Sequence, residues 1–170
     1  MVTQGAWKSV IYANETFVAV GLTAIPSSAV GRVMTSTTGV TEWFLQDTGV
    51  VTQGDWKSVI YANGKFVAVG GTPSSAVGRV MTSTDGVTKW RLQNSGVVTR
   101  GAWNSVIHAN GKFVAVGVNI ANVGLVMTAS QSNSSRTNRK PISSIYPVTS
   151  VIVHPGKVAR ATHPGKRPRP

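Results

Sequence analysis

The segment WKSVIYANGKFVAVG, residues 56–70, occurs three times in this chain with little change. The first copy, WKSVIYANETFVAVG, occupies residues 7–21, and the third, WNSVIHANGKFVAVG, occupies residues 103–117. The first two copies begin 49 residues apart, and the second and third begin 47 residues apart. A period in this range is typical of β-propeller blades, each of which is one supersecondary unit.

Within each period the pattern predicts four short antiparallel strands. In the middle copy, two stretches rich in β-branched and aromatic residues flank Asn63-Gly64, a dipeptide typical of a two-residue hairpin turn. No segment of the chain has a sustained helical period. The strands of this period are expected at residues 58–61, 66–69, 78–82 and 88–92. Four antiparallel strands without a helix favour a propeller blade over a β-sandwich.

The predicted fold class is all-β: a partial or oligomer-completed β-propeller of four-stranded antiparallel blades, followed by a basic and largely irregular C-terminal tail. The expected boundaries are residues 1–127 for the repeats (about 1–49, 50–96 and 97–127) and residues 128–170 for a Pro-rich tail, either disordered or adding one strand. The chain thus supplies two full blades and most of a third, whereas propellers close with four to eight blades. Three alternatives stay open: a homodimer that completes the propeller, an open array, and a truncated or frame-shifted remnant.

The net charge of the chain is concentrated in this tail. The 170 residues carry a formal net charge of +12, of which +4 lies in residues 1–127 and +8 in residues 128–170. The basic residues of the tail are Arg136, Arg139, Lys140, Lys157, Arg160, Lys166, Arg167 and Arg169. Such a segment can follow a phosphate backbone, so one hypothesis is weak, non-specific binding of nucleic acid or an anionic surface. The alternative is a disordered extension with little affinity for polyanions.

The composition excludes several classes of site. The chain has no cysteine, so it can form neither disulfides nor thiolate metal sites. We expect no metal and no cofactor, because His154 and His163 of the tail have no carboxylate nearby in the sequence. No apolar run is long enough for a transmembrane helix, and no secretory signal is visible. The localisation is therefore left unknown.

A second repeated feature follows the third predicted strand. The turn Ser83-Thr84-Asp85-Gly86 is followed by Trp90, and in the first period Ser36 and Trp43 keep the corresponding places. An aspartate in a tight turn accepts hydrogen bonds from backbone N–H groups two residues further on, and a glycine relieves the cost of positive φ. Trp90 can then cover the hairpin as a core plug. These residues are therefore predicted to be structural.

This Ser-x-Asp turn, with a tryptophan five residues after the aspartate, resembles the Asp-box of BNR or sialidase-like repeats. The wider pattern W-x-S-V-x-Y-x-N-G-x-F-V-A-V-G is similar to bacterial surface and phage propeller repeats related to the photosystem II assembly factor family. The resemblance covers residues 1–127 and departs from the family where Gly86 directly follows Asp85. It implies a β-propeller with a surface or virion location, while a cytoplasmic location stays open. In that family the Asp-box is a structural motif.

The residues do not predict catalysis. Glycosidases need two positioned carboxylates, or a tyrosine nucleophile with a carboxylate partner. The five acidic residues all occupy positions that change between periods: Glu15, Glu42, Asp47, Asp55 and Asp85. A sialidase would also use three arginines, but Arg32 and Arg79 are matched by Leu125 in the third period. We therefore expect no enzyme, with a remnant of a sialidase-like hydrolase as an alternative.

Two sets of repeated side chains are candidates for ligand contact. Trp7, Trp56 and Trp103 begin the three copies, and they form either an aromatic platform for sugars or peptides or the packing between blades. Arg32 and Arg79 are either ligand contacts or solvated strand residues that protect an edge.

The function predicted from these features is a non-catalytic β-propeller interaction module. It would bind a protein or a glycan through loops at one end of the blades, in a bacterial or phage surface or assembly role. The main alternative is a basic scaffold that binds nucleic acid or an anionic surface through residues 128–170.

Overall fold

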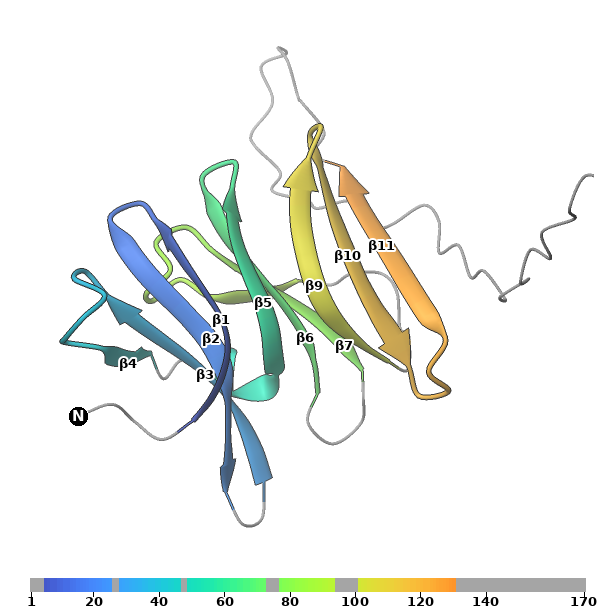
Figure 1. The fold of residues 1–170 in the computed structure, drawn as a ribbon, viewed down its shortest axis with the longest axis horizontal. Helices are drawn as coiled ribbons and strands as arrows, with labels where there is room; N and C mark the ends of the chain where they lie inside the picture. The colour runs from blue at the N-terminus through green and yellow to red at the C-terminus, as the bar shows by residue number, and fades with distance from the viewer. Residues whose placement is uncertain (1–4, 26–27, 47–48, 73–76, 94–100, 131–170) are drawn as a thin grey trace, which may run out of the picture.

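The structure of the chain, a computed structural model, describes residues 5–25, 28–46, 49–72, 77–93 and 101–130. Within these residues the chain forms three antiparallel sheets (Figure 1). The first sheet, blade 1, consists of β1 (Ala6–Ala13), β2 (Thr16–Ile25), β3 (Ser28–Ser36) and β4 (Phe44–Gln46). Blade 2 consists of β5 (Asp55–Ala62), β6 (Lys65–Gly71), β7 (Gly78–Ser83) and β8 (Arg91–Gln93). Blade 3 consists of β9 (Gly101–Ala109), β10 (Lys112–Asn119) and β11 (Gly124–Ser130).

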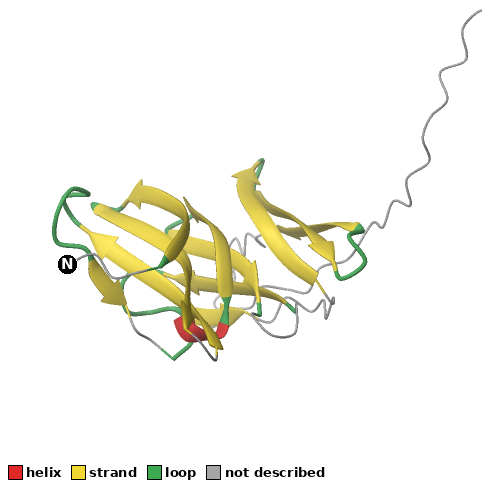
Figure 2. Ribbon diagram, turned by 60° about the horizontal axis from the view of Figure 1, so that its bottom comes forward, coloured by secondary structure: helices red, strands yellow, loops and turns green. Residues whose placement is uncertain are grey.

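Each sheet is a meander in which every strand pairs with the next strand along the chain. The helical content of the described residues is one 3-10 turn, η1 (Val51–Gln53), which stands out in Figure 2. The all-β class and the four-stranded antiparallel blades predicted from the repeat are confirmed. Residues 128–130 of the predicted tail belong to β11. The rest of the predicted tail, residues 131–170, lies outside the described residues.

The predicted fourth strand of blade 2 is wrong at its start. We expected it over residues 88–92, whereas β8 runs from Arg91 to Gln93. The reason is local: Asp85 accepts hydrogen bonds from the N–H groups of Thr88 and Lys89. These residues belong to the turn, so the chain enters the sheet only after them.

The three hairpin turns between the first and second strands of the blades have the conformation that the sequence predicts. Asn63 and Gly64 both have positive φ, at 53° and 72°, as a type I′ turn requires. Asn110 and Gly111 adopt the same conformation in blade 3. In blade 1 the second position is Glu15, with φ of 58°. A glutamate is thus held where the other two blades place glycine.

Replacing this glutamate should stabilise the protein. The left-handed conformation destabilises a residue with a Cβ by roughly 1–2 kcal/mol. Glycine avoids this strain, but its greater freedom in the unfolded chain offsets part of the gain in stability. We expect Glu15→Gly to raise the free energy of unfolding by about 1 kcal/mol in urea titrations, and Gly64→Glu to lower it by about the same amount. Loss of stability in Glu15→Gly would contradict this account of the turn.

Neighbouring blades pack face to face through two apolar cores. The core between blades 1 and 2 contains Val18, Val20, Val33, Val51, Trp56, Val59, Phe66, Ala68, Met81 and Trp90. The core between blades 2 and 3 contains Val67, Val69, Val80, Trp103, Val106, Ala115, Leu125 and Met127. The first strands β1, β5 and β9 lie side by side, so the blades succeed one another in chain order (Figure 1).

Candidate binding surface at the hairpin end of the blades

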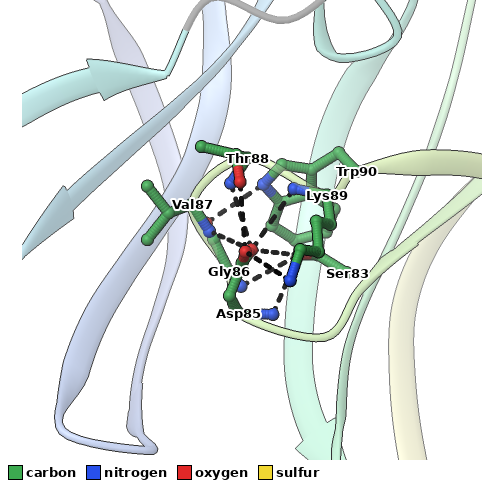
Figure 3. Close-up of polar contacts among 7 residues, drawn as sticks. All are labelled: Ser83, Asp85, Gly86, Val87, Thr88, Lys89 and Trp90. Atoms are coloured by element: carbon green, nitrogen blue, oxygen red, sulfur yellow. Dashed lines mark hydrogen bonds and ion pairs between the residues drawn. The ribbon is translucent and has the colours of Figure 1, made fainter.

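The turn between β7 and β8 is held by one carboxylate. Asp85 Oδ1 accepts hydrogen bonds from the N–H groups of Val87 and Thr88, at 2.9 and 3.0 Å, and from that of Lys89 at 3.3 Å (Figure 3). Ser83 Oγ donates to the same oxygen at 2.9 Å and accepts from Gly86 N–H at 2.9 Å. The bond from Val87 N–H is the one predicted for an aspartate in a tight turn.

The same turn places a tryptophan in the core. Trp90 is buried, and its indole N–H donates to the Gly86 carbonyl oxygen at 3.0 Å. Gly86 has φ of 74°, and a Cβ there would meet Val18 of blade 1 and Phe66 of its own blade. The turn therefore joins β7, β8 and the neighbouring blade, as a structural element would.

Hydrogen bonding decides the charge state of this carboxylate. Partial burial on its own raises the pKa of Asp85, but the bonds from Val87 N–H, the Ser83 hydroxyl and the Thr88 and Lys89 N–H groups outweigh it. The net result is a pKa well below the usual range of an aspartate. Asp85 is thus a fixed anion of the turn and holds no proton to donate at neutral pH.

Blade 1 has a weaker version of this turn. Thr38 Oγ1 accepts from the N–H groups of Val40 and Thr41 at 3.4 and 3.3 Å, so a hydroxyl replaces the carboxylate. Ser36 Oγ accepts from Gly39 N–H at 2.9 Å, as Ser83 does in blade 2. Trp43 stacks loosely on Phe17, with ring centroids 6.3 Å apart, and stays half-exposed.

Removing the carboxylate should therefore cost more than removing the hydroxyl. We expect Asp85→Ala to lower the free energy of unfolding by about 2 kcal/mol, because several backbone N–H groups lose a charged acceptor. Thr38→Ala, the matched control in blade 1, should cost about half as much or less. Equal losses in urea titrations would contradict the difference between the two turns.

The pH dependence of stability should also reflect the charge of Asp85. Because the folded pKa of Asp85 is lowered, its contribution is complete above the ordinary aspartate pKa of about 3.9 and is lost as the pH falls below it. Thermal melts of Asp85→Asn between neutral pH and the acid range should lose less stability on acidification than melts of the original chain. An unchanged acid dependence would contradict the assignment.

The three repeated tryptophans differ in their surroundings. Trp56 and Trp103 are buried between blades, with 0% and 1% of their surface exposed. Trp56 Nε1–H donates to the Val51 carbonyl oxygen at 2.6 Å. Trp7 is half-exposed, on the face of blade 1 that points away from blade 2.

The two repeated arginines are engaged with neighbouring polar groups. Arg32 Nε donates to Thr23 Oγ1 at 3.4 Å, and Arg79 Nη1 donates to Gln53 Oε1 at 3.4 Å. Both side chains are half-buried, and each lies on the same face of its blade as the repeated tryptophan. They do not converge on a common point, since one lies on the outer face of blade 1 and the other between blades.

The feature that sequence reasoning missed is at the hairpin end of the blades. The β1–β2, β5–β6 and β9–β10 turns lie at the same end of the molecule (Figure 1). Each presents an exposed asparagine, and behind each asparagine an aromatic pair stacks at 4.5–4.7 Å between ring centroids. The asparagines are Asn14, Asn63 and Asn110; the pairs are Tyr12–Phe17, Tyr61–Phe66 and His108–Phe113. We call this set the hairpin-end surface.

Two neighbouring turns of this surface are in contact. The Asn63 side-chain nitrogen Nδ2 lies 3.0 Å from His108 Nε2, so an amide of blade 2 bonds to the ring of blade 3. His108 takes the place that Tyr12 and Tyr61 hold in the first two copies. The signal that could have found the surface is the conserved spacing of an aromatic residue and an asparagine two positions later in every copy.

The acidic side chains that the structure describes have different surroundings. In the described ranges no three histidine, aspartate or glutamate side chains gather where they could hold a metal ion. Glu15 lies at a hairpin tip and Asp85 is tied to its turn. Asp55 pairs with Lys57 at 3.7 Å. Over the same part of the chain, no helix has the length and hydrophobicity to cross a membrane.

Three predictions from the sequence concern residues outside the described ranges. Asp47 and the eight basic residues of the tail, including Arg136 and Arg169, lie outside the described ranges. The predicted strand within the tail also lies outside them. The polyanion hypothesis therefore stays a prediction.

Comparison with known proteins identifies no family for the chain. No protein-family model matches the sequence, and no curated protein matches it. Among solved structures, the Bombyx mori GH32 beta-fructofuranosidase is similar over 73% of this chain, with 14% sequence identity and a TM-score of 0.45. The chain spans 33% of the length of that enzyme.

Proposed function

We propose that the chain is a non-catalytic binding module that contacts a glycan through the hairpin-end surface. The observation that carries the proposal is the threefold presentation of one exposed carboxamide at the same end of the blades: Asn14, Asn63 and Asn110. A carboxamide offers both a donor and an acceptor to sugar hydroxyls.

The surroundings of two acidic side chains support binding without hydrolysis. The Asp85 carboxylate is used by backbone N–H groups, and Asp55 pairs with Lys57 at 3.7 Å. A hydrolase remnant would leave the same fold with its acid and base missing. We also propose that the blades are Asp-box repeats of bacterial or phage surface proteins, supported by the Ser83, Asp85 and Trp90 turn.

The experiment is a glycan array probed with the full chain, followed by variants of the hairpin tips. Asn14→Gly, Asn63→Gly and Asn110→Gly together keep residues that accept positive φ and remove the amides, including the contact of Asn63 with His108. We expect this triple variant to weaken binding at least about tenfold, because each lost hydrogen bond contributes on the order of 1 kcal/mol.

The matched control is Asn122→Gly. Asn122 also has positive φ, at 57°, and is exposed, but it lies in the β10–β11 turn at the opposite end of the blades (Figure 1). Its replacement should leave binding unchanged. No glycan bound on the array, or equal binding by the triple variant and the original chain, would refute the proposal.

A second candidate function is binding of polyanions by the tail. It is favoured by the +8 charge of residues 128–170, against +4 for the rest of the chain. If about six basic side chains contact phosphates, the logarithm of affinity should fall with the logarithm of salt concentration with a slope of roughly −5. Replacing the eight basic residues with glutamine should abolish retention of DNA at low salt; unchanged retention would rule the tail out.

A further inference from the structure

Each blade has two different faces, and each internal interface joins the second face of one blade to the first face of the next. Strand pairing and burial assign the residues. The second face of blade 1 presents Ser9, Ile11, Val18, Val20 and Val33 to blade 2. The first face of blade 2 meets it with Trp56, Val59, Phe66, Ala68 and Met81. The interface between blades 2 and 3 is built the same way.

Two specific contacts recur at both interfaces. Ser9 Oγ accepts from Val59 N–H at 3.2 Å, and Ser58 Oγ accepts from Val106 N–H at 3.3 Å. A glycine on the third strand also leaves room for the tryptophan of the next blade. A Cβ at Gly31 would meet Trp56 Nε1 at 2.7 Å, and one at Gly78 would meet Trp103 Nε1 at 2.5 Å.

The outer faces of blades 1 and 3 each carry one half of this interface, with the same residue types. The first face of blade 1 has Trp7, Val10, Phe17, Ala19 and Met34. The second face of blade 3 has Ser105, Ile107, Val114, Val116 and Val126. At every one of these ten positions the residue is identical to its counterpart at an internal interface. The two end faces are therefore complementary to each other.

Exposure shows that these halves are open at several positions, although Ala19 and Met34 of blade 1 are only 6% and 4% exposed. Val10 is 60% exposed, whereas its counterparts Val59 and Val106 are 4% exposed. Val126 is 42% exposed, whereas Val33 is fully buried. Val10 and Val126, whose counterparts are buried at the internal interfaces, are thus left in solvent on the outer faces of blades 1 and 3.

The specific contacts are also left open. Gly124, the counterpart of Gly31 and Gly78, has nothing within 4 Å of the place where a Cβ would stand. The bond from the N–H of Val59 to the Ser9 hydroxyl recurs between Val106 and Ser58. Among the described residues, the corresponding groups on the outer faces, the Val10 N–H and the Ser105 hydroxyl, do not form this bond with another blade. Trp7 would fill the space at Gly124, as Trp56 does at Gly31.

We propose that a second copy of this chain docks head to tail, with the second face of blade 3 in one copy on the first face of blade 1 in the other. The contact continues an interface that the chain already builds twice. Two copies present two such contacts, and three blades from each give six, within the four to eight blades of closed propellers. The assembly is thus a six-bladed ring of two chains.

The test uses engineered cysteines in the full chain, which has none of its own. Val10→Cys with Ser105→Cys places thiols at the positions that match Val59 and Ser9. Under oxidation we expect most of this variant to run as a covalent dimer on a non-reducing gel. Ser9→Cys with Val59→Cys is the positive control, because it reproduces the geometry within one chain and should close without changing the mass of the chain.

The negative control pairs Ser105→Cys with Val40→Cys, which is exposed but lies in the β3–β4 turn outside the proposed contact. It should give little covalent dimer. A Val10/Ser105 pair that stays uncrosslinked while the Ser9/Val59 pair closes would overturn the proposal. Dimers formed equally by the negative control would overturn it too. If residues 131–170 cover blade 3 instead, the first of these results is expected.

Discussion

Replacing Trp56 with alanine is expected to lower the free energy of unfolding by about 4 kcal/mol. The indole is fully buried between blades 1 and 2, and its N–H donates to the Val51 carbonyl oxygen at 2.6 Å. Truncation of a buried tryptophan removes its transfer free energy, opens a cavity and here leaves a carbonyl oxygen without its donor. Urea titration followed by circular dichroism measures the change.

The control for this prediction is Trp7→Ala. Trp7 occupies the same place in blade 1 but is half-exposed, so its loss should cost about 1 kcal/mol. Both variants are compared in a Val10→Glu background, in which docking of a second copy is blocked by a charge at the open face. Equal costs for Trp7 and Trp56 would contradict the assignment of Trp56 to packing between blades.

Gly31→Ala should destabilise the chain by about 3 kcal/mol, although it adds only one methyl group. A Cβ at this position would overlap the carbonyl oxygens of Val51 and Gly54, which are backbone atoms, and would press on the Trp56 indole. Backbone atoms cannot rotate away as a flexible side chain would. The blades would have to separate locally to admit the methyl group.

Gly124→Ala is the matched control, because Gly124 holds the same place on the third strand of blade 3 and has open space beside it. In the Val10→Glu background it should leave the free energy of unfolding nearly unchanged. Alanine within a strand is at least as stabilising as glycine. A large loss of unfolding free energy would therefore have to come from a contact that the single chain lacks. A loss at Gly124 equal to that at Gly31 would contradict the packing of tryptophan on glycine.

The parts of the structure that sequence predicted are governed by local chemistry. Asn63 and Gly64 alone determine a type I′ turn, and Asp85 finds its N–H donors within four residues. Such features need no knowledge of the neighbouring blade. The period of 47–49 residues then predicts that the same blade recurs.

The parts that the sequence left open depend on contacts between different blades, whose residues lie 25 to 45 positions apart. Whether Trp56 packs or binds is decided by Gly31 of the preceding blade, and the contact of Asn63 with His108 joins two different blades. The sequence shows that such residues repeat but not which faces meet. The start of β8 was missed because Asp85 draws Thr88 and Lys89 into the turn.

The repeated blade interface, with one half open at each end of the chain, predicts that two chains associate. Static light scattering of the unmodified full chain, after size-exclusion chromatography, tests this most directly. The expected mass is that of two chains of 17.9 kDa each. A mass of a single chain across the accessible concentrations would contradict it.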